Sequence, residues 1–383
     1  MNSNEFYKKL IGSLKKNKFF WSLLIFIFIL HMVTYPSIHT IGDEELYLNI
    51  SKEICEHDFS YFFGERNETA HQPFYYVVLC VTSPIHNFTL GNAEVITYIF
   101  FIFLVLGWYL SVPYSWKISK KAFVLLLFSN SLLWVYSIRV LLDLPLAFFL
   151  SLGIFHLYLF FESGRKKNYY AGLILLALAM LTKESALSFL PIFVVYFLIK
   201  KDFNFKKWVS LIIPCIPWIL LSVYQYFSGF PIFWVFTMVF KSTTPIVWTQ
   251  NVPYAHLPTI LFMTGIFGPG IVSCILMWKN ALKKKDGTIR NFLLFSLVLY
   301  LLWEISYDFL LYGNMPRYHT ALMPFLTLII TAASNKSKKL RYVYYLTLIY
   351  SLTTGFIAAY YFHTYTQAIW KVSIKELMRL IPK

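Results

Sequence analysis

The chain has 383 residues, of which 58% are hydrophobic, 20% aromatic and only 14% charged. A soluble domain is typically about half apolar and about a quarter charged, so these proportions exclude an ordinary soluble domain and indicate a polytopic membrane protein. The net charge of +16 does not indicate nucleic-acid binding, because the basic residues form short clusters between apolar stretches rather than one basic face.

Apolar stretches that could cross a bilayer recur along the chain. A membrane-spanning helix needs roughly 20 predominantly apolar residues. The candidate spans are, in chain order, 19–36, 92–113, 122–139, 144–161, 169–183, 185–199, 208–226, 258–278, 291–310, 319–334 and 342–362. We therefore expect an all-α polytopic membrane protein with about 11 spans.

Six clusters of basic residues separate these spans and hold 24 of the 34 lysines and arginines. They fall within 8–18, 117–121, 165–167, 200–207, 279–290 and 336–341. Cytoplasmic loops carry the excess of lysine and arginine. All six clusters lie on the same side of the membrane only if residues 71–88 do not cross it. Pro73 and Pro84 interrupt this segment. We expect this segment to be an interfacial helix on the outer surface.

The topology divides the chain into three parts and predicts a multi-pass protein of the plasma membrane. Residues 1–18 form a cytoplasmic basic N-terminus, residues 19–362 the transmembrane domain, and residues 363–383 a short external amphipathic tail. The long external segments are 37–91, which would carry surface helices, and 227–257. Cys55 and Cys80 both fall in the first external loop, where a disulfide is conceivable but not expected.

Ionisable side chains collect at the outer ends of the predicted spans, where they are costly and tend to be functional. The main members are Asp43, Glu44, Asp143 and Glu184 among the acids, Arg139, Lys183 and Arg317 among the cations, and His71. A carboxylate can remove the proton of an incoming hydroxyl or amine. Cations can hold a phosphate and stabilise it as it leaves. These residue types favour the transfer of a phosphate-linked sugar.

Each of these groups also has a purely structural interpretation. Asp43 and Glu44 could cap a helix or lie in a solvated loop. Arg139 and Asp143 are four residues apart and could pair with each other at a helix end. The Lys183–Glu184 pair could lie at the membrane interface, with the aliphatic part of the lysine buried and its charged end in water. His71 could simply begin a helix.

Four segments, taken together, resemble the GT-C fold glycosyltransferases, in the branch of the protein O-mannosyltransferases and the bacterial lipid A aminoarabinose transferases. They are GDEELY at 42–47, HQPFYY at 71–76, RVLLDLPL at 139–146 and the glycine-containing stretch 172–184, which ends in LTKE. A weaker fifth match is Arg317-Tyr318 before Pro324. The resemblance implies a GT-C-like transmembrane bundle with interfacial helices in the first external loop.

The resemblance also implies roles for individual residues. Asp43 would be the catalytic base and Glu44 would support the catalytic site or the acceptor. Arg139, Lys183 and Arg317 would bind the donor phosphate or orient the site, and Asp143 would position Arg139 or bind substrate. The supporting residues would be His71, Tyr75, Glu184 and Tyr318. Some enzymes of this fold need a divalent metal, but no His/Cys cluster with ligand spacing is present, so no metal or other cofactor is predicted.

The predicted function is the transfer of a sugar from a dolichyl- or undecaprenyl-phosphate donor to a lipid, glycan or protein acceptor on the outer face of the membrane, by inverting displacement. The predicted partners are this donor, the acceptor and membrane lipids, but no nucleic acid. One alternative is a transporter or flippase of a lipid-linked sugar, although transporters usually place polar groups near the bilayer midplane in repeated halves. The others are a non-enzymatic partner in a membrane complex and a polymerase or ligase of surface polysaccharide.

Overall fold

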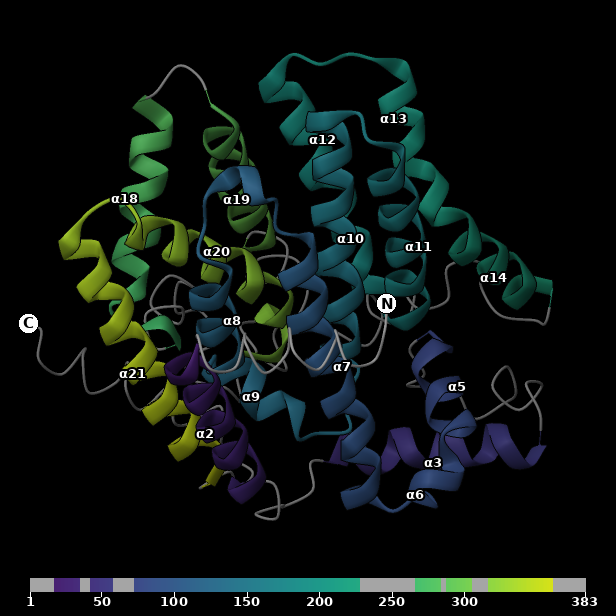
Figure 1. Cartoon of the computed structure of the whole chain (residues 1–383). Helices are drawn as coiled ribbons and strands as arrows, with labels where there is room; N and C mark the ends of the chain where they lie inside the picture. The colour runs from purple at the N-terminus through teal and green to yellow at the C-terminus, as the bar shows by residue number, and fades with distance from the viewer. Residues whose placement is uncertain are drawn as a thin grey trace, which may run out of the picture.

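The computed structural model describes residues 17–34, 42–57, 72–227, 266–283, 287–304 and 316–360, and every element in these ranges is a helix (Figure 1). The α-helices are α2 (Lys18–Thr34), α3 (Gly42–His57), α5 (Phe74–Val81), α6 (Ser83–His86), α7 (Leu90–Ser111), α8 (Lys120–Phe128), α9 (Ser131–Ser137), α10 (Asp143–Ser163), α11 (Lys166–Thr182), α12 (Phe189–Lys200), α13 (Phe205–Ile212), α14 (Ile216–Phe227), α18 (Gly270–Lys283), α19 (Thr288–Glu304), α20 (Met323–Ser334) and α21 (Lys338–Tyr360). Short 3₁₀ helices are η1 (Tyr114–Trp116), η2 (Glu184–Ser188), η3 (Ile213–Cys215) and η5 (Pro316–Leu322).

Helices occupy the described part of every predicted span. Within the described ranges, four stretches are long and apolar enough to cross a membrane, namely α7, α10, α21 and the run from α13 to α14. Three shorter apolar helices correspond to α2, α19 and α20. The all-helical membrane architecture is therefore as expected, and the count of about eleven crossings stays a prediction. The second external segment, the external tail and nearly all of the basic N-terminus lie outside the described residues.

The predicted span 122–139 is two helices rather than one. Helix α8 ends at Phe128, and α9 begins at Ser131 after a short break. Asn130 causes the new start, because its side-chain oxygen accepts the backbone N–H of Leu133 at 3.1 Å and so caps α9. The break directs α9 and the turn after it, which carries Arg139, into the protein interior, where both are buried.

The segment that was expected to lie on the outer surface is too short to cross a membrane. It folds as the eight-residue helix α5 and the four-residue helix α6, separated by Thr82. At 1.5 Å per residue, α5 is about 12 Å long, well below the roughly 30 Å of a bilayer core. Figure 1 shows α3 running across the same end of the bundle, next to α5. Helix α5 suits the interfacial position that the basic clusters predicted for 71–88, and α3 suits the surface helices that the resemblance implies for this loop.

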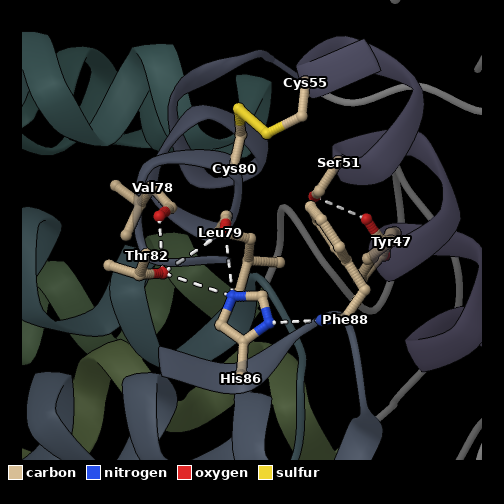
Figure 2. The surroundings of a disulfide bond; sticks show 9 residues. All are labelled: Tyr47, Ser51, Cys55, Val78, Leu79, Cys80, Thr82, His86 and Phe88. Atoms are coloured by element: carbon tan, nitrogen blue, oxygen red, sulfur yellow. Dashed lines mark hydrogen bonds between the residues drawn. A yellow bond between two sulfur atoms is a disulfide. The ribbon is translucent and has the colours of Figure 1, made fainter. Parts of the chain in front are cut away.

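A disulfide joins these two helices, contrary to the expectation from sequence. Cys55 of α3 and Cys80 of α5 are bonded, with Cα atoms 5.5 Å apart (Figure 2). His86 fixes the turn that follows α5: its Nδ1 accepts the Phe88 N–H at 3.0 Å, and its Nε2 donates to the Leu79 carbonyl at 2.9 Å. The disulfide and these hydrogen bonds thus tie α3, α5 and the turn that follows α5 to one another.

The bundle has two chemically different ends. We call the end where α10 begins, at Asp143, the site end, and the opposite end the basic end. Three of the basic segments meet at the basic end, because Lys121 Nζ donates to the Asn17 side chain and the Asn335 side chain donates to the Lys117 carbonyl at 3.0 Å. The 21 residues of α10 separate the two ends by about 31 Å, which matches the thickness of a bilayer core.

Helices α10 and α11 pack closely enough to fix the relative positions of the residues at their ends. A Cβ atom on Gly172 would lie 3.0 Å from the Leu157 backbone nitrogen and 3.3 Å from the Gly153 carbonyl oxygen. The absence of side chains at Gly153 and Gly172 lets the two backbones approach, as small residues do at membrane helix interfaces. This explains the glycine in the stretch 172–184.

Candidate functional site

Charged side chains are buried where four segments converge at the site end. The segments are the first turn of α3, the turn between α9 and α10, the junction of α11 with η2, and η5. Counted over the whole residue, Glu44, Arg139, Asp143 and Lys183 are each at most 5% exposed. Buried charges must be paired or hydrogen-bonded, so their partners define the geometry of the site.

Glu44 and Arg139 form the first pair. Arg139 Nη1 lies 3.5 Å from Glu44 Oε2, and Glu44 Oε1 accepts the backbone N–H of Val140 at 2.9 Å. One carboxylate therefore holds both the side chain and the backbone of the α9–α10 turn. That Arg139 serves the donor phosphate stays a prediction; what the structure shows is that it joins α3 to the bundle through Glu44.

Asp143 is the centre of the second group. Its Oδ1 accepts a hydrogen bond from Lys183 Nζ at 3.1 Å, and its Oδ2 lies 4.0 Å from Arg317 Nε. The hydroxyl of Thr320 in η5 donates to the Asp143 carbonyl at 3.2 Å. Asp143 is the first residue of α10 and Lys183 directly follows α11, so each charge also suits the dipole of its own helix.

Glu94 is a member of the site that the sequence analysis missed. It lies in the first turns of α7 and is fully buried, and within the described residues neither of its carboxylate oxygens has a hydrogen-bond partner. The charges of Glu44 and Glu94 both act on Arg139, which places Glu94 in the same electrostatic group. The signal was available: a lone carboxylate in an apolar span is costly and tends to be functional.

Tyr75 brings helix α5 into this group. Its hydroxyl hydrogen-bonds the Thr97 hydroxyl of α7 at 2.7 Å. Burial raises the pKa of the Tyr75 phenol, the bond to Thr97 lowers it, and the charges of Glu44 and Glu94 raise it again. The net effect is a rise, so Tyr75 stays protonated at neutral pH and acts as a polar support rather than as an anion.

The remaining predicted site residues are only partly placed. Glu184 is buried at the start of η2, next to Lys183. Asp43 is in the first turn of α3 and Tyr318 is in η5, but the side chains of both lie outside the described part of the chain. His71 lies outside it altogether. Within the described residues, no group of three or more His, Cys, Asp or Glu could hold a metal ion.

The fold has counterparts among solved structures. No protein-family model and no curated protein matches the sequence. ArnT from Cupriavidus metallidurans in the apo state matches 86% of this chain and 62% of its own, with 14% identity and a TM-score of 0.61. ArnT bound to undecaprenyl phosphate matches 82% of this chain and 60% of its own, with 14% identity and a TM-score of 0.58. The chain has the GT-C fold.

The match confirms the resemblance that the four sequence motifs indicated. At 14% identity it establishes the fold and not the reaction. This chain spans about three-fifths of the length of the ArnT chains that it matches.

Proposed function

We propose that this protein is a glycosyltransferase that moves a sugar from a polyprenyl-phosphate donor to a hydroxyl or amine of a lipid, glycan or protein acceptor. The observation that carries the proposal is the convergence of Glu44–Arg139 and Asp143–Lys183–Arg317 at one end of a GT-C bundle. A lipid-linked donor is supported by the neighbour that was solved with undecaprenyl phosphate. Carboxylates and cations from distant segments are what such a transfer needs.

In the proposed reaction, Asp43 takes the proton of the acceptor hydroxyl or amine. The acceptor oxygen or nitrogen then attacks the anomeric carbon and forms the new glycosidic bond with inversion. The bond between the anomeric carbon and the phosphate oxygen breaks, and the polyprenyl phosphate leaves with the bonding electron pair. Asp43 is adjacent to Glu44, whose contacts with Arg139 and Val140 hold the start of α3 against the bundle.

Among the three cations, Arg317 is best exposed to meet the donor phosphate. Its side chain is 19% exposed, against 7% for Lys183 and 1% for Arg139. Arg317 is also the more loosely held partner of Asp143, at 4.0 Å compared with 3.1 Å for Lys183. We assign Arg317 direct contact with the phosphate, and Lys183 and Arg139 the supporting positive potential.

The proposed orientation places the site end outside the cytoplasmic membrane. The basic segments meet at the opposite end, and an excess of lysine and arginine marks the cytoplasmic side. The Cys55–Cys80 disulfide at the site end supports the same orientation, since disulfides persist in oxidising compartments. In this position the polyprenyl chain remains in the hydrocarbon while its phosphate enters the site.

The test is a transfer assay on the full chain in proteoliposomes, with a panel of polyprenyl-phosphate sugars and with envelope lipids and glycans as acceptors. Mass spectrometry of the same fractions from a deletion strain would identify the acceptor. Asp43→Asn should abolish the release of polyprenyl phosphate, whereas Glu56→Gln, a half-exposed change on the same helix, should not. Wild-type turnover by Asp43→Asn would overturn the assignment of the base. Movement of the intact donor across the bilayer without sugar transfer would identify a flippase instead.

A further inference from the structure

A cavity of about 850 Å³ lies at the basic end, about 31 Å along α10 from Asp143. It is formed by the last turn of α7, the η1 segment, the end of α10 and the start of α11. Its volume falls within the roughly 300–1,000 Å³ of ordinary ligand sites. None of the residues assigned to the proposed transfer lines it, so it is a separate feature of the molecule.

The lining of this cavity is suited to an anion. Arg165 and Lys167 contribute two exposed positive charges. Helix α11 begins between them, without a side-chain cap and without an acidic residue in its first turn. The free N–H groups and the positive dipole end of such a helix favour a bound phosphate. The two cations and the start of α11 therefore attract an anion into the same cavity.

Two other polar groups of the cavity, on His156 and Glu162, already have hydrogen-bond partners. His156 Nε2 is hydrogen-bonded to the Ser111 hydroxyl at 2.9 Å. Glu162 is the carboxylate in the lining, and its two oxygens accept hydrogen bonds from Tyr196 at 2.8 Å and Asn291 at 2.7 Å. Lys200 Nζ lies 3.8 Å from the same carboxylate and offsets its charge. Glu162 therefore does not cancel the attraction of Arg165 and Lys167 for an anion.

The cavity lies at the depth of the lipid headgroups. Helix α7 has 22 residues and is about 33 Å long, so its last turn, at the cavity, reaches the boundary between hydrocarbon and headgroups. Tyr114 at the rim is 81% exposed, and Lys120 Nζ lies 3.9 Å from the centre of its ring. Exposed aromatic and lysine side chains are typical of this boundary.

Apolar side chains continue from the cavity toward the middle of the membrane. Leu110, in the lining, is 74% exposed. Ile174, one helical turn after the lining residue Ala171, is 62% exposed. Acyl chains would cover these side chains, whereas a free phosphate ion would leave them uncovered.

We propose that this cavity binds an anionic phospholipid of the leaflet at the basic end, with its phosphate at Arg165, Lys167 and the start of α11. Its acyl chains lie along Leu110 and Ile174. A zwitterionic lipid carries a compensating cation in its headgroup and binds more weakly. Occupancy bridges α7, η1, α10 and α11. This proposal does not depend on the reaction at the site end.

The test is native mass spectrometry of the full chain in detergent, titrated with phosphatidylglycerol, phosphatidylcholine or inorganic phosphate. Wild-type protein should retain phosphatidylglycerol at lower concentration than phosphatidylcholine, and added salt should weaken its binding. Arg165→Gln/Lys167→Gln should weaken phosphatidylglycerol binding roughly thirtyfold, since each of the two basic residues near an anionic surface contributes on the order of one kcal/mol and about 1.4 kcal/mol is tenfold in affinity. Arg165 and Lys167 are exposed, as are Lys338 and Lys339, which are exchanged in the control below, so both double variants should fold.

The matched control is Lys338→Gln/Lys339→Gln, which removes two positive charges at the same end, at the start of α21, where neither lysine lines the cavity. It should bind phosphatidylglycerol as wild type does. Equal weakening in both double variants would overturn the site in favour of general surface attraction. Equal binding of phosphatidylcholine would overturn the anion preference, and displacement of phosphatidylglycerol by millimolar phosphate would indicate a free-phosphate site.

Discussion

Glu44 in the first turn of α3 pairs with Arg139 at 3.5 Å, and the two residues connect a surface helix to the interior of the bundle. Both side chains are almost fully buried. Removing one partner of a buried pair leaves an uncompensated charge, which costs about 3–5 kcal/mol. We therefore expect Glu44→Gln to lower the free energy of unfolding by about 3 kcal/mol, measured by thermal unfolding in detergent.

Glu94→Gln is the matched comparison for Glu44→Gln, because both variants replace a buried carboxylate of the same electrostatic group by an amide. Within the described residues Glu94 has no hydrogen-bond partner to lose, and its charge lies near that of Glu44. We expect its unfolding temperature to equal or exceed that of wild type. An equal loss of stability in the two variants would contradict the distinct roles that the contacts indicate.

Arg317 is predicted to act on the donor rather than on stability. Arg317→Gln leaves Asp143 paired with Lys183 at 3.1 Å, so the protein should unfold near the wild-type temperature. Loss of a charge-assisted bond to phosphate costs about 1.5–3 kcal/mol, which corresponds to a fall in kcat/KM of about tenfold or more. Arg341→Gln, an exposed arginine at the basic end, is the control. Equal activity of the two variants would remove Arg317 from the phosphate site.

The Cys55–Cys80 disulfide is predicted to stabilise the surface helices that present the start of α3. It closes a loop with a sequence separation of 25 residues, for which the chain-entropy model gives about 3.5 kcal/mol. Cys55→Ser/Cys80→Ser should therefore increase protease cleavage between α3 and α5 and reduce sugar transfer. A membrane-impermeant reductant should reproduce both effects in wild type and add nothing in the double variant. Equal sensitivity of the two proteins to the reductant would argue against the bond.

The contact of α10 with α11 at Gly172 is predicted to set the distance between Asp143 and Lys183. In Gly172→Ala the new methyl group would meet backbone atoms at 3.0 and 3.3 Å, so the two helices must separate slightly. Such overpacking typically costs about 1–3 kcal/mol, and transfer should fall as well. Gly91→Ala makes the same change in α7 with no atom within 4 Å, and should stabilise the helix by up to about 1 kcal/mol. We expect Gly172→Ala to lower the unfolding temperature and Gly91→Ala to raise it.

The sequence predicted the helical elements better than the contacts between their ends. Long apolar runs locate spans because the bilayer imposes a length, and basic clusters separate the two ends because they resist transfer through the membrane. The same reasoning could not foresee the break at Asn130, since one side-chain cap decides it. The disulfide was also missed, because no spacing rule relates cysteines on two separate helices.

Arg139 and Asp143 illustrate why the site itself needed the structure. Residues four apart lie side by side on one helix, which made a direct pair a reasonable alternative. Helix α9 ends at Ser137 and α10 begins at Asp143, however, so the two residues are not on one helix. Arg139 pairs with Glu44 and Asp143 with Lys183, partners 95 and 40 residues away along the chain. Only the packed bundle determines such pairs.

The spread of the site along the chain has a consequence for biosynthesis. Its described members run from Glu44 in α3 to Arg317 in η5, so no shorter fragment contains them all. During translation, Glu44 and Arg139 can meet while most later helices are still unmade, but Asp143 gains Arg317 only after the segment around η5 has been made. Under the proposed function, a nascent chain would therefore stay inert toward donor lipids until η5 reaches the site.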